Sequence, residues 1–87
     1  MDVSPSDPLL GFATRLRALR LERGLSQETL ADLAQLDRTY VSSCEAGRRN
    51  VTLRTICRLA AALQVDPGVL VSGLGMPDPS GASASGR

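Results

Sequence analysis

Apolar residues recur at helical spacing along most of the chain, in five stretches that short polar connections separate. The first stretch follows Asp7-Pro8, a capping carboxylate and a proline suited to the first turn of a helix, and Gly24 ends it. This pattern predicts a helix over residues 8–23. Its expected core positions are Leu9, Phe12, Ala13, Leu16 and Leu19, with Arg15, Arg17, Arg20 and Arg23 facing outward.

The same signals predict four more helices, over residues 27–34, 38–46, 53–63 and 67–71. Their caps are Ser26, Asp37, Thr52 and Asp66. Their expected inward positions are Leu30, Ala31, Leu33, Ala34, Val41, Cys44, Leu53, Ile56, Leu59, Ala60 and Leu63. The sequence therefore predicts an all-α domain over residues 7–74. A flexible segment (residues 1–6) is expected before it, and a disordered tail without apolar periodicity (residues 75–87) after it.

The predicted core is small and almost entirely aliphatic. The chain of 87 residues is long enough for one domain, and Phe12 and Tyr40 are its only aromatic residues. Cys44 and Cys57 have neither the number nor the spacing for a disulfide framework or a zinc site, so both are interpreted as small apolar residues within helices. So small a core favours further burial through self-association.

The composition argues against an enzyme. Histidine and lysine are both absent, which removes the usual activated nucleophiles, Schiff-base chemistry and the phosphate-binding lysine of P-loops. We therefore expect no catalytic residue, no metal, no cofactor and no small-molecule ligand. The first residues form no signal peptide, and no stretch approaches the roughly 18–20 apolar residues of a membrane span. These features predict a cytoplasmic protein without a membrane partner.

Positive charge is concentrated in the middle of the chain. The formal net charge is only +1, yet residues 34–58 contain five arginines against two acidic residues, Asp37 and Glu45. In the same region two short helices are joined by the three residues Gln35-Leu36-Asp37. Such a pair is typical of helix-turn-helix proteins that bind DNA, in which the second helix enters the major groove.

The outer faces of the predicted helix 38–46 carry side chains suited to base recognition. Arginine can bind guanine through two hydrogen bonds, and hydroxyl groups suit either a base or a phosphate. The candidate base-contacting residues are Arg38, Thr39, Ser42 and Ser43. Arg48 and Arg49, in the loop that follows, are candidates for phosphate contacts. The alternative for each of these residues is an ordinary solvated surface.

Several motifs agree in register with one known family. The chain resembles the Cro/C1-type (phage-repressor-like, XRE) regulators from about Leu9 to Gly73, in the strings Ser26-Gln27-Glu28-x-Leu30-Ala31, Asp37-Arg38-Thr39-Tyr40-Val41-Ser42 and Glu45-x-Gly47-Arg48-Arg49-Asn50, followed by Leu53. Within that family it is most similar to controller proteins of restriction-modification systems. The resemblance implies a five-helix, lambda-repressor-like DNA-binding domain with a helix-turn-helix.

The resemblance also implies a function. It implies a homodimer that binds a pseudo-palindromic operator in double-stranded DNA and, in a controller, regulates its own promoter. The residues that it places on the DNA backbone are Gln27, Tyr40, Arg48, Arg49 and Asn50. Two positions depart from the family pattern: Gln35 replaces a frequent glycine, at a cost of roughly 1 kcal/mol if it is left-handed, and Cys44 replaces a bulkier aliphatic residue.

The dimer interface is expected at the C-terminal end of the domain. The predicted helix 67–71 is too short to bury every side, and Val69, Val71 and Leu74 form an apolar patch distant from the helix 38–46. One of the three, with Val71 as the first choice, is instead available to complete the core of the monomer. A two-fold dimer would place its recognition helices about 34 Å apart, one turn of DNA.

Two other functions fit the same helices, because a fold alone does not determine function. A protein-interaction module, such as an antitoxin or an adaptor, has no need for the polar and basic surface from Arg38 to Arg49. An RNA-binding protein is disfavoured because the aromatic stacking platforms of single-strand readers are absent. The operator, any effector, the regulated genes and the choice between activation and repression are not encoded in a pattern of this kind.

Overall fold

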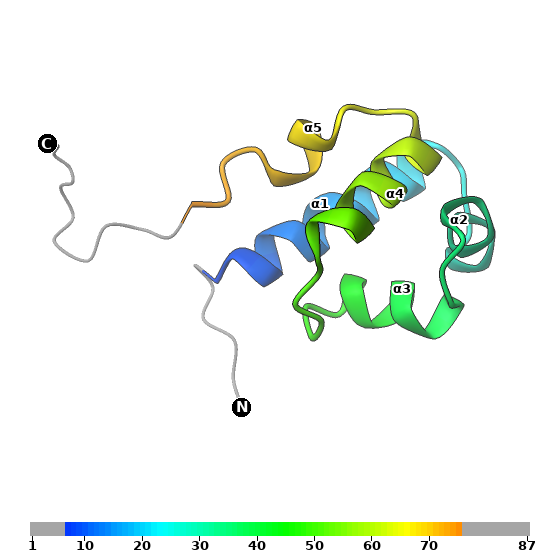
Figure 1. Ribbon diagram of the computed structural model, residues 1–87, viewed down its shortest axis with the longest axis horizontal. Helices are drawn as coiled ribbons and strands as arrows, with labels where there is room; N and C mark the ends of the chain where they lie inside the picture. Colours follow the sequence, from blue (N-terminus) through cyan, green and yellow to red (C-terminus); the bar gives the residue numbers. More distant parts are fainter. Residues whose placement is uncertain (1–6, 76–87) are drawn as a thin grey trace, which may run out of the picture.

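The computed structural model describes residues 7–75, which form five α-helices and no strand (Figure 1). The helices are α1 (Pro8–Glu22), α2 (Gln27–Ala34), α3 (Arg38–Glu45), α4 (Leu53–Leu63) and α5 (Pro67–Val71). Each begins at the residue that the sequence predicts, and α1 and α3 end one residue before the predicted end. The segment 1–6, and residues 76–87 of the predicted tail, lie outside the described residues.

A capping side chain explains where each helix begins. The side-chain oxygen of the N-cap residue accepts a hydrogen bond from a main-chain N–H of the first turn, which would otherwise lack a partner within the helix. The donor lies two residues after each aspartate cap and three residues after each hydroxyl cap. The caps are Asp7, Ser26, Asp37, Thr52 and Asp66.

Four of the helices end in the same kind of turn. A residue with positive φ follows the helix, and the N–H of the next residue donates to a carbonyl five positions earlier, at 2.8 to 3.1 Å. Glycine occupies the positive-φ position after α1 and α3, where Gly24 and Gly47 have φ values of 70° and 73°. Gln35 and Gln64 occupy it after α2 and α4, with φ values of 59° and 60°. Gln35 is therefore left-handed, and Gln64 repeats its conformation.

The helices enclose one aliphatic core. α3 packs against α1 and α2, while α4 packs against α2 and α5. In Figure 1, α3 and α5 lie on opposite sides of the domain. The largest buried side chains between the helices are Phe12, Leu16, Leu30, Val41, Leu59, Leu63 and Leu70.

Two leucines that the sequence places in the core are exposed. Leu33 and Leu53, expected in the core, are 56% and 75% exposed. Helical spacing identifies an apolar face, but it does not say how wide a sector of that face the neighbouring helices cover. In α5, Leu70 is fully buried and Val71 is 40% exposed, so among Val69, Val71 and Leu74 it is Leu74 that packs against the core.

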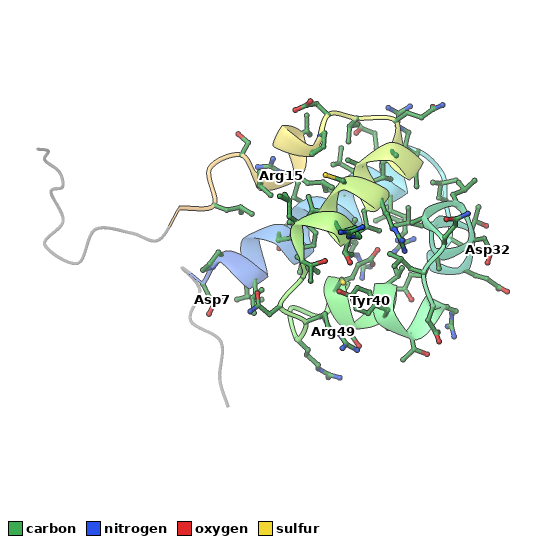
Figure 2. All side chains as sticks on the ribbon, viewed as in Figure 1. Asp7, Arg15, Asp32, Tyr40 and Arg49 are labelled. Atoms are coloured by element: carbon green, nitrogen blue, oxygen red, sulfur yellow. The ribbon has the colours of Figure 1, made fainter. Side chains whose placement is uncertain are left out.

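The chain after α5 returns to α1. Leu74 packs against the core, and its Cδ2 atom lies 2.6 Å from the position that a Cβ atom would take on Gly11. The Arg15 guanidinium donates hydrogen bonds to the main-chain carbonyls of Val69 and Ser72, near the end of α5 (Figure 2). An apolar contact and a polar contact thus hold α5 and the following residues against α1.

Candidate nucleic-acid interface

α3 has one apolar and one polar face. Val41 and Cys44 are completely buried, which directs the opposite side of the helix to solvent. The predicted base-contacting residues on that exposed side are Arg38, Thr39 and Ser42. Ser43, the fourth candidate, is half-buried, so it is less available to a ligand than the other three.

A basic loop continues the polar face of α3. The positive φ of Gly47 turns the chain, and Arg48, Arg49 and Asn50 follow with exposed side chains. Within residues 7–75, the side chains of Arg38 and Arg48 form no hydrogen bond or ion pair with another residue. Their hydrogen-bond donors are therefore free for an external acceptor such as a phosphate or a guanine edge.

Arg49 and Tyr40 are paired with each other. The guanidinium carbon of Arg49 lies 4.6 Å from the centre of the Tyr40 ring, in a cation–π contact (Figure 2). The Tyr40 ring is half-buried and also packs against the core. The contact therefore places the loop beside the first turn of α3, so two predicted backbone-contacting residues lie together.

Behind this surface lies a buried ion pair. Arg20 Nε and Nη2 donate to Glu45 Oε2 and Oε1 at 2.6 and 3.0 Å, and Arg20 Nη1 donates to the carbonyl of Leu25 at 2.8 Å. Arg20 is 7% exposed, so the prediction that it faces outward is wrong. Hydrogen bonding to Glu45 raises the pKa of Arg20 despite the opposing effect of burial.

Gln27 joins the same pair from the first position of α2. Its side-chain Nε2 donates to Glu45 Oε1 at 3.1 Å, and the residue remains half-exposed. The structure thus brings Gln27, a predicted backbone-contacting residue, to the C-terminal end of α3. The first turn of α2 and the last turn of α3 are linked through one carboxylate oxygen.

The two cysteines have opposite environments. Cys44 is 1% exposed, and burial raises the pKa of its thiol to about 11. Cys57 is a free, exposed cysteine on α4, so of the two only Cys44 is packed in the core. Within residues 7–75, no cluster of three or more histidine, cysteine, aspartate or glutamate side chains is placed to hold a metal ion.

Sequence reasoning missed Arg20 and Glu45, although their positions carry a signal. Arg20 follows Leu16 by four residues, and Glu45 follows Val41 by four, so each lies in phase with the buried face of its helix. When two helices each carry a charged residue on the buried face, and the two charges are opposite, the pattern indicates a buried ion pair. Gln27 has no comparable signal for its contact with Glu45, because the contact depends on how α2 and α3 pack.

The arrangement of α2, the short turn and α3 is that of a helix-turn-helix protein. Residues 12–73 match the family model described as a helix-turn-helix domain, over more than two thirds of the chain. The chain belongs to this family. The predicted fold class and the resemblance to helix-turn-helix regulators are confirmed.

Several named relatives are controller proteins of restriction-modification systems. The chain is 41% identical over 70 residues to control protein C.SmaI of Serratia marcescens, covering 80% of this chain and 83% of that one. The crystal structure of the restriction-modification controller protein C.AhdI from Aeromonas hydrophila is 55% identical, with a TM-score of 0.70 over 71% of this chain and 94% of that one. The controller C.Esp1396I, solved as a tetramer with its natural 35 base-pair operator, is 34% identical, with a TM-score of 0.70 over 77% and 88%.

None of the five helices described in residues 7–75 has the length and apolar character needed to cross a membrane.

Proposed function

We propose that this protein is a sequence-specific transcriptional regulator that binds a pseudo-palindromic operator as a homodimer. In this proposal it is the autoregulating controller of a restriction-modification system, and it acts in the cytoplasm by binding DNA rather than by catalysis. The observation that carries the proposal is the exposed polar face of α3, which continues into a basic loop. The similarity to C.SmaI and C.AhdI supports the restriction-modification role.

Base recognition falls to the exposed face of α3. Arg38 is the first residue of the helix, so its long side chain projects from the end that enters a groove. Thr39 and Ser42 offer hydroxyl groups on the same exposed side, with Ser43 in a secondary position at the edge of the buried face. Arg38 is therefore the residue from which we expect most of the discrimination between sequences.

Phosphate contacts are assigned to residues on either side of α3. Arg48, Arg49 and Asn50 are exposed in the loop after the helix, and Gln27 lies at the start of α2. Tyr40 orients the Arg49 guanidinium through their cation–π contact. These contacts position the protein on the duplex and supply affinity, whereas they carry little sequence information.

The proposed dimer uses the side of the domain opposite α3. Val69 and Val71 of α5 are 39% and 40% exposed, whereas Leu74 packs against the core beside Gly11. Leu53 and Cys57, one helical turn apart, form another exposed apolar strip, on α4. Dimerisation through α5 would cover Val69 and Val71 and leave both α3 helices free for DNA.

Two arginine substitutions test the proposal. The wild-type chain is used to select a duplex from a random library, and Arg38→Ala and Arg48→Ala are titrated against that duplex and a scrambled one. Arg38→Ala should lose about 1–3 kcal/mol of discrimination between the duplexes. Arg48→Ala should weaken binding to both and lower the slope of log K against log salt concentration by about one per subunit.

Arg17→Ala is the matched control, because Arg17 is exposed on α1, outside α2 and α3. It should change neither discrimination nor, to any large extent, affinity. If the selection enriches no duplex, the protein is not a sequence-specific DNA reader. If Arg38→Ala weakens both duplexes equally, Arg38 does not read bases.

A further inference from the structure

Glu45 occupies an unusual place for a carboxylate near a proposed DNA surface. It is the last residue of α3, its side chain is only 3% exposed, and both of its oxygens are held by the Arg20 guanidinium. Its Oε1 atom also accepts the hydrogen bond from Gln27 Nε2. Three segments of chain therefore meet at one carboxylate: the end of α1, the start of α2 and the end of α3.

We infer that Glu45 and Arg20 are positioning residues of the DNA interface, which act through Gln27. This inference rests on the proposed function. Arg20 fixes the Glu45 carboxylate, and Glu45 fixes the Gln27 amide so that its remaining Nε2 hydrogen is ready to meet a phosphate oxygen. Neither Arg20 nor Glu45 touches the DNA.

The hydrogen-bond geometry supports each step. A bidentate contact defines both the place and the plane of the Glu45 carboxylate, because the guanidinium fork is rigid. A primary amide has two N–H donors, and the contact with Oε1 uses one of them. The second stays available because Gln27 is half-exposed. A long polar side chain held in its bound orientation loses less entropy when the ligand arrives.

The start of α2 supplies a second reason for this arrangement. The Ser26 hydroxyl oxygen accepts the N–H of Thr29, so within the described residues the main-chain N–H groups of Gln27 and Glu28 remain without an acceptor. A phosphate at this helix end would meet those groups beside the Gln27 amide. Arg20 also neutralises Glu45, whose charge would otherwise repel the phosphate.

A direct measurement needs no substitution. The chain has three glutamines, Gln27, Gln35 and Gln64, and the latter two are exposed left-handed residues that serve as internal references. In the free protein, the side-chain NH₂ group of Gln27 should be more ordered in ¹⁵N relaxation than those of Gln35 and Gln64, and its two proton signals should lie further apart than theirs. If Gln27 is as mobile as Gln35 and Gln64, the inference is wrong.

The role of the ion pair in DNA binding is tested by comparing the effect of Gln27→Ala with and without the ion pair. Gln27→Ala should lower affinity for the selected duplex about tenfold per subunit in the wild-type background, the usual effect of one hydrogen bond to a charged group. In the background Arg20→Met with Glu45→Leu, which replaces both charges by apolar groups and so leaves no unpaired buried charge, Gln27→Ala should cost less than about twofold. A melt confirms that this background is folded.

Two controls separate a positioning role from a merely structural one. Gln27 is uncharged, so Gln27→Ala should leave the salt slope unchanged and should weaken the selected and scrambled duplexes alike. Glu45→Gln keeps an acceptor oxygen but loses the ion pair, and it should reduce the Gln27→Ala effect only in part. An equal cost of Gln27→Ala in every background would overturn the inference while leaving the proposed function intact. A wild-type chain that enriches no duplex would overturn both.

Discussion

Two turns of this protein share a sequence pattern and a main-chain geometry, yet they lead to different surfaces. The chain runs Gln35-Leu36-Asp37 after α2 and Gln64-Val65-Asp66 after α4. The two glutamines have φ and ψ values of 59° and 46°, and of 60° and 42°. In both turns the apolar residue bonds back to the preceding helix and the aspartate caps the next one. Local sequence determines how these helices are joined.

The helices after the turns determine what each pair does. α3 has eight residues, with two buried apolar positions and an exposed polar side. α5 has five residues, begins with Pro67, buries Leu70 and exposes Val69 and Val71. The first pair offers hydrogen-bond donors to an external ligand, and the second offers an apolar patch. The comparison teaches that one kind of connection can join helix pairs whose outer surfaces differ in chemistry.

The largest effect is expected when the second pair loses its apolar patch. Val69→Asp together with Val71→Asp should give a monomer in sedimentation, because carboxylates at a closed apolar interface are strongly unfavourable. Operator affinity should fall about a hundredfold or more, since the two half-sites are then bound independently. Leu74 stays unchanged because it packs on Gly11.

Leu21→Asp with Leu33→Asp is the matched control for that experiment. These leucines are 55% and 56% exposed and lie on α1 and α2, so the variant adds the same charge outside the proposed interface. It should remain a dimer with nearly unchanged affinity. A dimeric protein with both valines replaced would place the interface elsewhere, first on the α4 strip of Leu53 and Cys57.

Each helix pair contains one cysteine, and the two thiols differ in burial: Cys44 of α3 is buried and Cys57 of α4 is exposed. The buried Cys44 thiol has a pKa of about 11, against 9.0 ordinarily. Between these pH values the unfolded thiol ionises and the folded one does not, so the free energy of unfolding should fall as pH rises. The loss should level off above about pH 11, at no more than about 2–3 kcal/mol.

Urea unfolding of the wild type and of Cys44→Ala, from pH 8 to pH 11, isolates this contribution, because all other titrations cancel in the difference. A thiol reagent gives an independent check at pH 8. Cys57 should react at once in the folded protein, and Cys44 only after unfolding. Parallel pH curves for wild type and variant would contradict a protonated Cys44.

The smallest effect concerns the turns themselves. Gln35→Gly and Gln64→Gly each relieve a left-handed residue with a Cβ atom, which is worth roughly 1 kcal/mol, offset in part by the added freedom of glycine in the unfolded chain. Both variants should melt slightly higher than wild type and by similar amounts. Opposite signs for the two would show that the turns differ in energy despite their common geometry.

The sequence predicts the helices well because each helix boundary is determined by residues close to it in the sequence. Each cap lies within three residues of the N–H it binds, and each helix-ending turn spans six residues. Exposure is less predictable. Leu53 has helical spacing with the core, but no neighbouring helix covers it enough to bury it. Arg20 is buried because Glu45, 25 residues away, meets it there.

In the candidate site, too, some features follow from local sequence and others depend on packing between helices. Arg38, Thr39 and Ser42 are exposed as predicted from the apolar phase of α3, although their contacts with DNA remain a prediction. The orientation of Gln27 depends on a carboxylate 18 residues away, and that of Arg49 on the ring of Tyr40. Residue types and spacing indicate which side chains are available, whereas packing decides which of them are held in place.

Because Gly11 and Leu74 pack against each other, the effect of a substitution at one of these positions should depend on the residue at the other. A methyl group on Gly11 would stand 2.6 Å from the tip of the Leu74 side chain, which is flexible enough to swing aside at the expense of its packing. The Gly11→Ala substitution would thus disturb the packing of the chain where it leaves α5, 60 or more residues away in sequence. Shortening Leu74 should suppress it, so among descendants of this gene a larger residue at position 11 should be found with a smaller one at position 74.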